Sequence, residues 1–326
     1  MLTPLVQLIG GFLLMVWAAD RLVAGASATA RNLGVSPMII GLTIVGFGTS
    51  APELVVSAVA TYRDNAGLAL GNALGSNITN LGLVLGITAL IYPLRLESAA
   101  LKREYPLLLL IMLVCLFLIL DLEYSHTDGW IMLAGLALLV RWLIQLGLQR
   151  PATDPLAEEF KAEIPTNIPT KVAVFWLTVG LIVLPVSSMI LVDGAVSIAR
   201  GLGVTDTVIG LTIVALGTSM PELATAVTSA FRREDDLAIG NIIGSNMFNM
   251  LGVLGIAAVI RPVQAPPLLI ARDFPVMFLM TGLLFLMATN FRGPGRISRR
   301  SGLLFLTLFF SYQAMVWIQA GHFLAS

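Results

Sequence analysis

Long apolar segments, separated by short polar connections, make up most of the chain. A bilayer core requires about 20 apolar residues per helix, and by that length the pattern predicts an all-α membrane protein with ten spanning helices. Their approximate ranges are residues 5–23, 37–61, 68–91, 106–120, 129–148, 172–199, 207–231, 237–260, 274–288 and 302–320. Residues 149–171, rich in Pro, Glu and Thr, form a predicted linker between two five-helix halves, residues 1–148 and 172–326.

Polar residues recur inside these apolar segments, and the two halves share them. GLTIVGFGTSAPEL at residues 41–54 returns as GLTIVALGTSMPEL at residues 210–223, with 11 of 14 positions identical. GNALGSNITN at residues 71–80 returns as GNIIGSNMFN at residues 240–249, at the same offset of 169 residues. Five spans separate the copies, so each helix of the second half is predicted to cross the membrane opposite to its partner. Such inverted repeats are typical of secondary transporters with a midplane binding site, although a duplication can also persist as a structural relic.

Basic residues are distributed unevenly over the connections. With the N-terminus outside, thirteen lie on the cytoplasmic side and four on the outer side. Because positive charge accumulates in cytoplasmic loops, both termini are predicted outside and the linker inside. The thirteen are Arg31, Arg95, Lys102, Arg103, Arg150, Lys161, Lys171, Arg232, Arg233, Arg292, Arg296, Arg299 and Arg300, and the four are Arg63, Arg200, Arg261 and Arg272.

Composition agrees with a multi-pass membrane protein. The chain is 57% hydrophobic and 12% charged, with a mean hydropathy of +0.91, whereas soluble domains are about one quarter charged. Net charge is zero and no basic run stands out, so no nucleic-acid partner is expected. The expected partners are the lipid bilayer and inorganic cations, with no obligate protein partner evident. The single cysteine, Cys115, cannot form an internal disulfide.

Two prolines interrupt the repeated motif. Pro52 lacks the N–H that the carbonyl of Gly48 would accept in a helix, and Pro221 does the same to Gly217. Spans two and seven are therefore predicted to be broken helices, with spans three and eight as further candidates. Carbonyls freed at membrane depth need another partner, and a hard cation can supply one. The candidate carbonyls are those of Gly46, Gly48, Ala215 and Gly217.

Oxygen-bearing side chains follow a four-residue spacing in both motifs, and residues four apart share one face of a helix. The pairs are Thr49 with Glu53, Ser76 with Asn80, Thr218 with Glu222, and Ser245 with Asn249. Carboxylate, amide, hydroxyl and carbonyl oxygens suit hard cations such as Ca²⁺. Neither histidine, His126 in a loop or His322 near the C-terminus, joins the set, so zinc or copper is poorly supported.

The negative charge of two glutamates within the membrane favours an exchanger over a simple cation-binding site. Each ionised carboxylate inside a membrane costs about 3 kcal/mol on insertion scales, and Glu53 and Glu222 would also repel each other. One Ca²⁺, two Na⁺ or two H⁺ would neutralise the pair. The empty site, with two ionised carboxylates, has a high free energy inside the membrane. The protein is therefore expected to change between its two access states only with cations bound, so that one kind of cation is exchanged for another.

The paired GTSxPE and GNxxGSNxxN blocks resemble the alpha-repeats of the calcium/cation antiporter superfamily, and specifically its sodium/calcium exchanger family in a compact bacterial inner-membrane form. The resemblance implies Ca²⁺ extrusion driven by inward Na⁺ through alternating access, without a cofactor beyond the transported ions. It implies that ions bind where spans two, three, seven and eight meet. The implied principal ligands of Ca²⁺ and Na⁺ are Glu53 and Glu222, assisted by Thr49 and Thr218; Ser50, Ser219, Ser76 and Ser245 would complete the sodium sites, and Asn80 and Asn249 would line the centre. In archaeal and potassium-dependent relatives, an aspartate often replaces the residue matching Asn249, which leaves Na⁺ stoichiometry and K⁺ dependence open.

Two other kinds of function remain in competition with Na⁺/Ca²⁺ exchange. The same two glutamates can carry protons in a H⁺/Ca²⁺ or Na⁺/H⁺ antiporter, although the surrounding serines favour Na⁺. A passive cation channel is a weaker alternative. An enzyme is not expected, because no nucleophile–base pair or catalytic metal set is evident.

Several polar residues outside the predicted ligand set receive structural interpretations. Asp20 beside Arg21 is read as an interfacial pair, and Asp193, which aligns with Ala24, as a residue at a span end. The asparagines Asn72, Asn77, Asn241 and Asn246 are read as helix-packing or helix-terminus hydrogen bonders, with contact with the ion path as the alternative.

Overall fold

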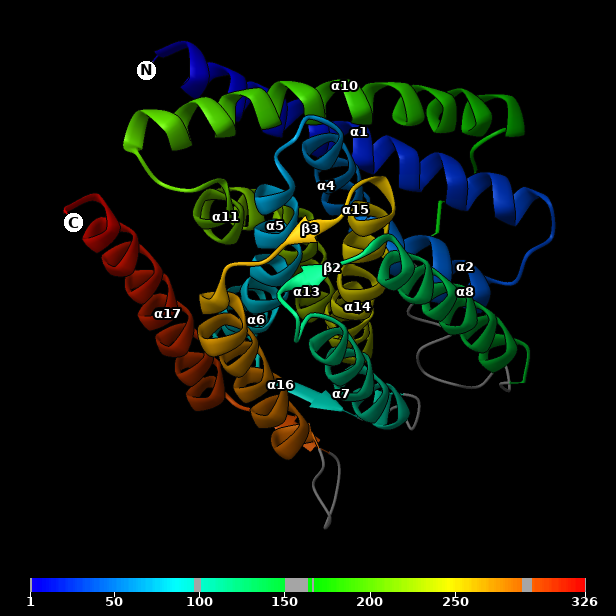
Figure 1. Ribbon diagram of the computed structural model, residues 1–326. Helices are drawn as coiled ribbons and strands as arrows, with labels where there is room; N and C mark the ends of the chain where they lie inside the picture. Colours follow the sequence, from blue (N-terminus) through cyan, green and yellow to red (C-terminus); the bar gives the residue numbers. More distant parts are fainter. Residues whose placement is uncertain (1, 97–100, 150–163, 166, 289–294, 326) are drawn as a thin grey trace.

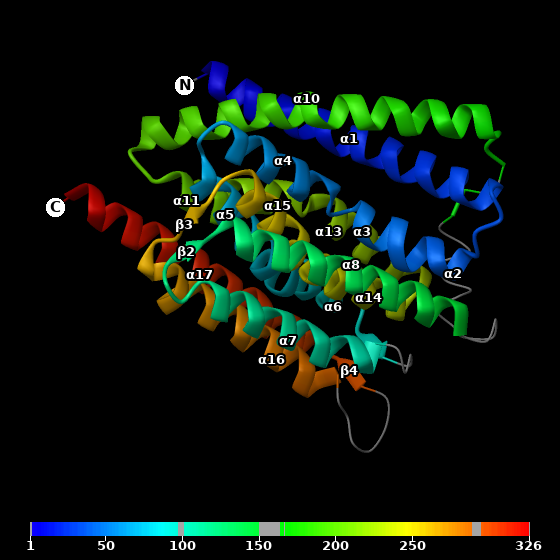
Figure 2. The same cartoon turned by 45° about the vertical axis from the view of Figure 1, so that its right-hand side comes forward.

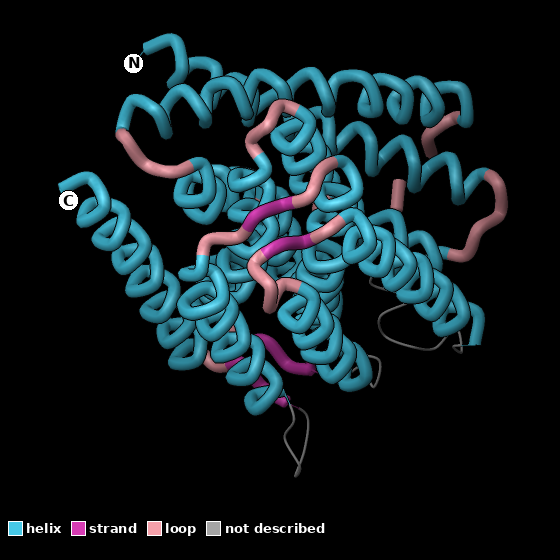
Figure 3. Tube along the Cα trace, in the orientation of Figure 1, coloured by secondary structure: helices cyan, strands magenta, loops and turns pink. Residues whose placement is uncertain are grey.

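The computed structural model describes residues 2–96, 101–149, 164–165, 167–288 and 295–325, and most of them are helical (Figures 1 and 3). Within those ranges seven helices are long and apolar enough to cross a membrane, or eight if one bent pair counts as a span. The predicted count of ten is not reached by length and composition alone. Span two is interrupted at Thr49–Ser50, and the apolar helix of span four, Glu104–Leu118, is short. Most of the predicted linker lies outside the described residues.

The first half contains the following elements: α1 (Leu2–Asn32), α2 (Pro37–Ile40), η1 (Gly41–Val45), α3 (Gly46–Gly48), α4 (Ala51–Tyr62), α5 (Ala66–Thr79), η2 (Asn80–Val84), α6 (Leu85–Ile91), β1 (Leu94–Leu96), α7 (Leu101–Leu118), β2 (Glu123–Tyr124) and α8 (His126–Gln149). The second half contains α10 (Thr170–Leu202), α11 (Asp206–Ile209), η3 (Gly210–Val214), α12 (Ala215–Thr218), α13 (Met220–Arg232), α14 (Asp235–Phe248), η4 (Asn249–Val253), α15 (Leu254–Ile260), β3 (Val263–Gln264), η5 (Leu269–Asp273), α16 (Phe274–Ala288), β4 (Gly295–Ile297) and α17 (Arg299–Ala325). The segments marked η are π-helical.

Two unusually long helices lie side by side across one face, α1 and α10 (Figures 1 and 2). They have 31 and 33 residues, or about 46–50 Å at 1.5 Å per residue, which exceeds a bilayer core of about 30 Å and requires tilt. Glycine permits the close approach: a Cβ on Gly25 would lie 2.4 Å from the backbone nitrogen of Leu177. Small residues at such contacts are typical of helices packed within membranes.

Two helical segments form the centre of the molecule, α5–η2–α6 and α14–η4–α15. Within the most apolar window of each, 78% and 83% of the residues are buried. Both contain a π-turn at equivalent positions, beginning at Asn80 and Asn249. They are otherwise continuous, so the suggestion that spans three and eight are broken is wrong. Neither contains a proline, and a π-turn absorbs one extra residue without ending the helix.

Spans two and seven are interrupted at their repeated Thr-Ser pairs. Thr49 and Ser50 form a turn between α3 and α4, and the axis bends by 40° between α12 and α13. Pro52 and Pro221 lie in the first turn of the following helix, where a missing N–H costs least. The prolines therefore begin new helices instead of kinking old ones.

Two short antiparallel strand pairs join the halves. Strand β1 pairs with β4, and β2 pairs with β3. Each pair takes one strand from each half of the chain. The halves are thus interleaved, with the first motif of each on an interrupted span and the second on a central segment.

Candidate functional site

All ten predicted side-chain ligands are buried where the broken spans meet the central helices. Thr49 retains 8% of its surface, Ser219 1%, and the other eight none. They come from the turn before α4, from α4 itself, from α12–α13 and from the junctions α5–η2 and α14–η4. The sequence motifs therefore converge at one place from both halves of the chain.

Serines of one half reach the glutamate of the other. Ser50 Oγ donates to Glu222 Oε1 at 3.1 Å, and Ser219 Oγ donates to Glu53 Oε1 at 3.5 Å. Ser245 Oγ also donates to Glu222 Oε1, at 3.1 Å. Each carboxylate therefore accepts one hydroxyl hydrogen bond from the other half, and Glu222 accepts a second one from Ser245 of its own half.

Thr49 does not share a helical face with Glu53, as its four-residue spacing predicts, because the helix is interrupted between them. Its hydroxyl donates to Asn241 Oδ1 at 3.2 Å and lies 3.4 Å from Ser245 Oγ. Both partners belong to α14, in the other half. The spacing argument fails here because it assumes a continuous helix.

The equivalent threonine makes the same kind of contact. Thr218 Oγ1 donates to Asn72 Oδ1 at 3.0 Å and lies 3.3 Å from Ser76 Oγ. The amide nitrogen of Asn72 donates to the backbone oxygen of Glu53 at 3.2 Å and to Ser57 Oγ at 3.0 Å. Asn72 and Asn241 thus position site threonines, which agrees better with the alternative of contact with the ion path than with helix packing alone. The available signal was their shared place at the start of the second motif.

A second asparagine network crosses the centre. Asn80 Nδ2 donates to Asn246 Oδ1, and Asn249 Nδ2 donates to Asn77 Oδ1, both at 3.1 Å. Asn77 Nδ2 also donates to the backbone oxygen of Asn246 at 3.3 Å. These bonds fix the amide nitrogens of Asn80 and Asn249, so that their oxygens are free to face other groups.

Four oxygens at the site have no hydrogen-bond donor among the residues that the structure describes. They are Glu53 Oε2, Glu222 Oε2, Asn80 Oδ1 and Asn249 Oδ1, and all are buried. A buried acceptor without a partner costs roughly 1–3 kcal/mol, and more when it is charged. Two carboxylates and two amide oxygens form a donor set that a hard cation can satisfy.

Helix ends favour negative charge at the two glutamates. Glu53 and Glu222 lie in the first turns of α4 and α13, where the helix dipole stabilises an anion. Their side-chain hydrogen bonds come from neutral serine hydroxyls. The arrangement can therefore hold two carboxylates close together and leave their charge for a cation to neutralise.

The predicted carbonyl ligands differ in their surroundings. The oxygen of Ala215 already accepts the N–H of Ser219 at 3.1 Å and the hydroxyl of Thr218 at 3.4 Å, whereas that of Gly46 faces Gly244 of α14. Gly48 and Gly217 have helical backbones, so the motif does not use their freedom to adopt positive φ. A Cβ on Gly48 would lie 2.4 Å from Val23 Cγ2, which explains that glycine by close packing against α1.

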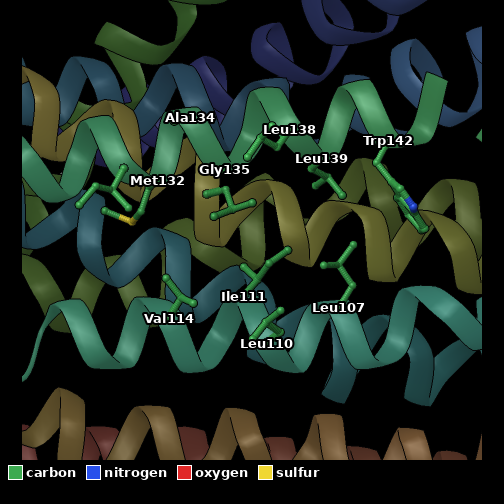
Figure 4. Close-up of a pocket in the computed structure, with 12 residues that line it drawn as sticks. Leu107, Leu110, Ile111, Val114, Met132, Ala134, Gly135, Leu138, Leu139 and Trp142 are labelled. Atoms are coloured by element: carbon green, nitrogen blue, oxygen red, sulfur yellow. The ribbon is translucent and has the colours of Figure 1, made fainter. Parts of the chain in front are cut away.

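An apolar cavity lies between α7 and α8, with Leu251 of η4 in its wall (Figure 4). Its volume is about 800 Å³. Apolar side chains form its walls, including Leu107, Ile111, Leu138 and Trp142. It offers no oxygen ligands comparable to those of the glutamate site.

Charged residues outside the site form ion pairs. Asp20 lies 3.5 Å from Arg21, in keeping with the predicted pair. Asp193 binds Arg63, which ties α10 to the connection between α4 and α5.

Arg272, predicted in an outer loop, is instead 8% exposed in η5, where its Nε lies 2.6 Å from Asp273 Oδ1. In the sequence, only the aspartate at the next position indicates this pairing. Arginine and aspartate are often neighbours in loops, so the signal does not distinguish a buried pair.

Comparison with known proteins gives consistent matches over nearly the whole chain. A family model described as sodium/calcium exchanger protein matches residues 3–149 and 172–318. The putative antiporter CaxA of Alkalimonas amylolytica is 45% identical over 97% of this chain and 99% of its own. The inner membrane protein YrbG of Escherichia coli (strain K12) is 41% identical over 97% and 98%.

Solved structures give a similar result. A structure of the sodium-calcium exchanger NCX_Mj matches with a TM-score of 0.67 and 33% identity, and covers 96% of this chain and 98% of its own. At lower similarity, the Ca(2+)/H(+) antiporter ChaA of Bacillus subtilis (strain 168) is 26% identical over 74% of each chain.

Proposed function

The chain belongs to the sodium/calcium exchanger protein family, and on that premise we propose that it exchanges Ca²⁺ for Na⁺ across the membrane by alternating access. The family consists of transporters, so the chain is a Ca²⁺/cation antiporter and not an enzyme, and it works without a cofactor. The proposal concerns the coupling ion, the mechanism and the residues that bind the ions.

The observation that carries the proposal is the set of four buried oxygens without donors. Ca²⁺ would bind the free carboxylate oxygens of Glu53 and Glu222, with the amide oxygens of Asn80 and Asn249 between them. Thr49 and Thr218 would complete the principal site. Ca²⁺ accepts six to eight oxygen ligands, so water and the Gly46 carbonyl have room to contribute.

Hydroxyl groups favour Na⁺ as the coupling ion. Three serines donate to the carboxylates, namely Ser50, Ser219 and Ser245, and a fourth, Ser76, lies 3.3 Å from the hydroxyl of Thr218. A hydroxyl oxygen can coordinate Na⁺, whereas a proton bound to a carboxylate needs no such shell. We therefore assign the four serines to sodium binding, next to the calcium ligands.

An inverted ten-span repeat gives the simplest account of alternating access. The π-turns recur at the same 169-residue offset as the motifs, at Gly41 and Gly210 and at Asn80 and Asn249. The exchange of strand partners between halves supports a twofold relation. Residues 1–148 and 172–326 would be the two repeats, joined by the linker 149–171.

One relative bears on localisation. YrbG is named an inner membrane protein, and we place this chain in the same kind of membrane. The N- and C-termini lie at one end of the molecule in both ribbon views (Figures 1 and 2). With the distribution of basic residues, this supports two outer termini and a cytoplasmic linker. Inorganic cations and lipid are sufficient partners for the proposed activity.

Coupling to H⁺ is the second candidate, favoured by the similarity to ChaA. The test is uptake of radioactive Ca²⁺ into proteoliposomes that contain the purified chain, driven by an outward Na⁺ gradient, by a pH gradient or by neither. Uptake with the Na⁺ gradient alone is expected. Uptake with the pH gradient alone would assign H⁺ as the coupling ion, and downhill flux without either would indicate a channel. Liposomes without protein are the control.

A further inference from the structure

The two long helices α1 and α10 pack against each other symmetrically. A Cβ on Gly11 would lie 2.7 Å from the backbone nitrogen of Leu191, and a Cβ on Gly180 would lie 2.7 Å from the Cα of Leu22. Gly11 and Gly180 are separated by the repeat offset of 169 residues, and so are Leu22 and Leu191. The repeat therefore extends to these helices, and residues of α10 have counterparts on α1.

The same two helices differ in their contacts with the rest of the molecule. Helix α10 packs against α4. The counterparts of these helices are α1 and α13, which have no comparable contact within the described residues. A cavity of about 320 Å³ lies between them instead, with Ala24 and Thr225 in its wall. Inverted-repeat transporters change access when one bundle moves against the other, so a counterpart state is expected in which α1 meets α13 and α10 leaves α4.

An ion pair crosses the contact between α10 and α4. Asp193 of α10 binds Arg63, which directly follows α4. The counterpart of Arg63 is Arg232, the last residue of α13, but the counterpart of Asp193 is Ala24. Ala24 carries no charge and lines the cavity. The acid is therefore present on α10 and missing from the equivalent position of α1.

Asp20 is the only acid of α1 and does not take this place. Its counterpart on α10 is Met189, about one helical turn before Asp193. Asp20 also lies 3.5 Å from Arg21, its immediate neighbour. The difference between the two halves at Asp193 is thus not compensated on α1.

The next residue along the chain makes a contact that both halves retain. Asp64 binds Arg261, and their counterparts, Arg233 and Tyr92, form a cation–π contact with 5.7 Å between the guanidinium carbon and the ring centre. The helices that carry them pack alike in both halves, α15 against α4 and α6 against α13. This contact does not distinguish the two access states, whereas the pair at Asp193 does.

We propose that the ion pair between Arg63 and Asp193 is a one-sided latch, which favours the access state of this structure over its counterpart. The inference rests on the proposed alternating access. In the counterpart state Asp193 leaves Arg63 and faces a cavity, as Ala24 does now, and Ala24 supplies no carboxylate for a matching pair at α13. The two access states are therefore unequally populated, even though the helices are related by a repeat.

The distance between α10 and α4 tests the latch without requiring transport. Spin labels are attached at Leu181→Cys on α10 and Tyr62→Cys on α4, both exposed positions, while the native Cys115 is fully buried. Double electron–electron resonance in lipid nanodiscs, at fixed Na⁺ and Ca²⁺ concentrations, gives the fractions of molecules with the shorter and the longer distance. Asp193→Asn is expected to lower the ratio of short to long about twofold to fivefold, as for a partly exposed ion pair.

Three further variants separate the latch from a general loss of structure. The charge swap Arg63→Asp with Asp193→Arg should restore the wild-type ratio. Ala24→Asp, which supplies the missing acid on α1, should lower the ratio as Asp193→Asn does. Asp64→Asn is the matched control, since it breaks the contact that both halves retain, and should leave the ratio unchanged.

A wild-type ratio in Asp193→Asn, or a charge swap that does not restore it, would overturn the latch. An unchanged ratio in Ala24→Asp would show that the missing acid does not make the two states unequal. Expected distances in a protein that fails to couple Na⁺ to Ca²⁺ would contradict the proposed coupling alone.

Transport gives a second measurement of the same quantity. The apparent affinity on each face of the membrane scales with the population of the state that faces it. In Asp193→Asn the ratio of the half-saturating Ca²⁺ concentrations on the two faces should change by the same factor as the distance populations. Equal changes on both faces would mean that Asp193 acts on ion binding and not on the balance between states.

Discussion

At the residue scale, the two glutamates carry the charge of the site. Each is fully buried, and each has one oxygen bonded to serine and one without a donor. A carboxamide has nearly the same shape but no charge. Replacing one glutamate therefore tests charge with little change in packing.

Glu53→Gln or Glu222→Gln is expected to reduce Ca²⁺ uptake to the level of protein-free liposomes, because one remaining carboxylate cannot neutralise Ca²⁺. Uptake of radioactive Ca²⁺ under a Na⁺ gradient measures the effect, and size-exclusion profiles show whether the variants fold. Glu123→Gln, in β2 and away from the site, serves as the matched control. Normal uptake in either site variant would remove that glutamate from the site.

Asn249→Asp is expected to change the dependence of transport on monovalent ions, because it adds a third negative charge beside an unpaired oxygen. The half-saturating Na⁺ concentration should shift, and the response to K⁺ with it. Dose–response curves for both ions provide the measurement. Curves that overlay those of the wild type would mean that Asn249 does not face the ions.

Transport should also fall as the medium becomes acidic. Ca²⁺ and Na⁺ bind the ionised form of Glu53 and Glu222, so protons compete for the same oxygens. Raising the Ca²⁺ concentration should restore the rate at a given acidic pH, if competition is the cause. Inhibition that Ca²⁺ does not relieve would place the titrating group elsewhere.

At the element scale, a buried ion pair holds η5 against α17. Arg272 is bonded to Asp273 and donates to Gln319 Oε1 at 2.8 Å, while Tyr312 donates to Asp273 Oδ1 at 2.9 Å. Removing one member of such a pair leaves an uncompensated buried charge. The pair is a structural contact, distinct from the glutamate site.

Asp273→Asn is expected to destabilise the protein by about 3–5 kcal/mol, because Arg272 remains buried without a counter-charge. Thermal stability in detergent gives the measurement. The double variant Arg272→Met, Asp273→Leu should recover most of the loss, since it removes both charges. A single variant as stable as the wild type would show that Arg272 finds another partner.

The elements also show which parts of the fold were predictable. The proline positions predicted where spans two and seven break, because a proline acts on its own helix. The π-turns at Gly41 and Asn80 were not predicted, since they depend on packing against the other half. The same limit applies to Ser50 and Glu222: spacing along one helix does not say which helix lies opposite.

At the scale of the whole molecule, repetition made the site visible. Identical residues at a constant offset predicted which side chains meet at the glutamate site, although the two copies lie more than 150 residues apart in the sequence. The family assignment followed from them, the membrane class followed from the apolar segments, and both are confirmed by the comparisons. The number of spans did not follow as surely, because short and interrupted helices escape a criterion of length.

Orientation can be tested on the intact chain. A periplasmic phosphatase fused after Ser326 is expected to be active, because the C-terminus is predicted outside, while a fusion after Arg232 is expected to be inactive. Enzyme activity normalised to fusion-protein level gives the answer. The reverse pattern would invert the assignment of both sides while leaving the fold unchanged.

The exchanged strand pairs have a consequence for the independence of the two halves. Strands β1 and β2 belong to the first half and find their partners, β4 and β3, in the second. A polypeptide that ended after the first half would therefore leave both of its strands without a partner, so the two halves depend on each other to complete these sheets.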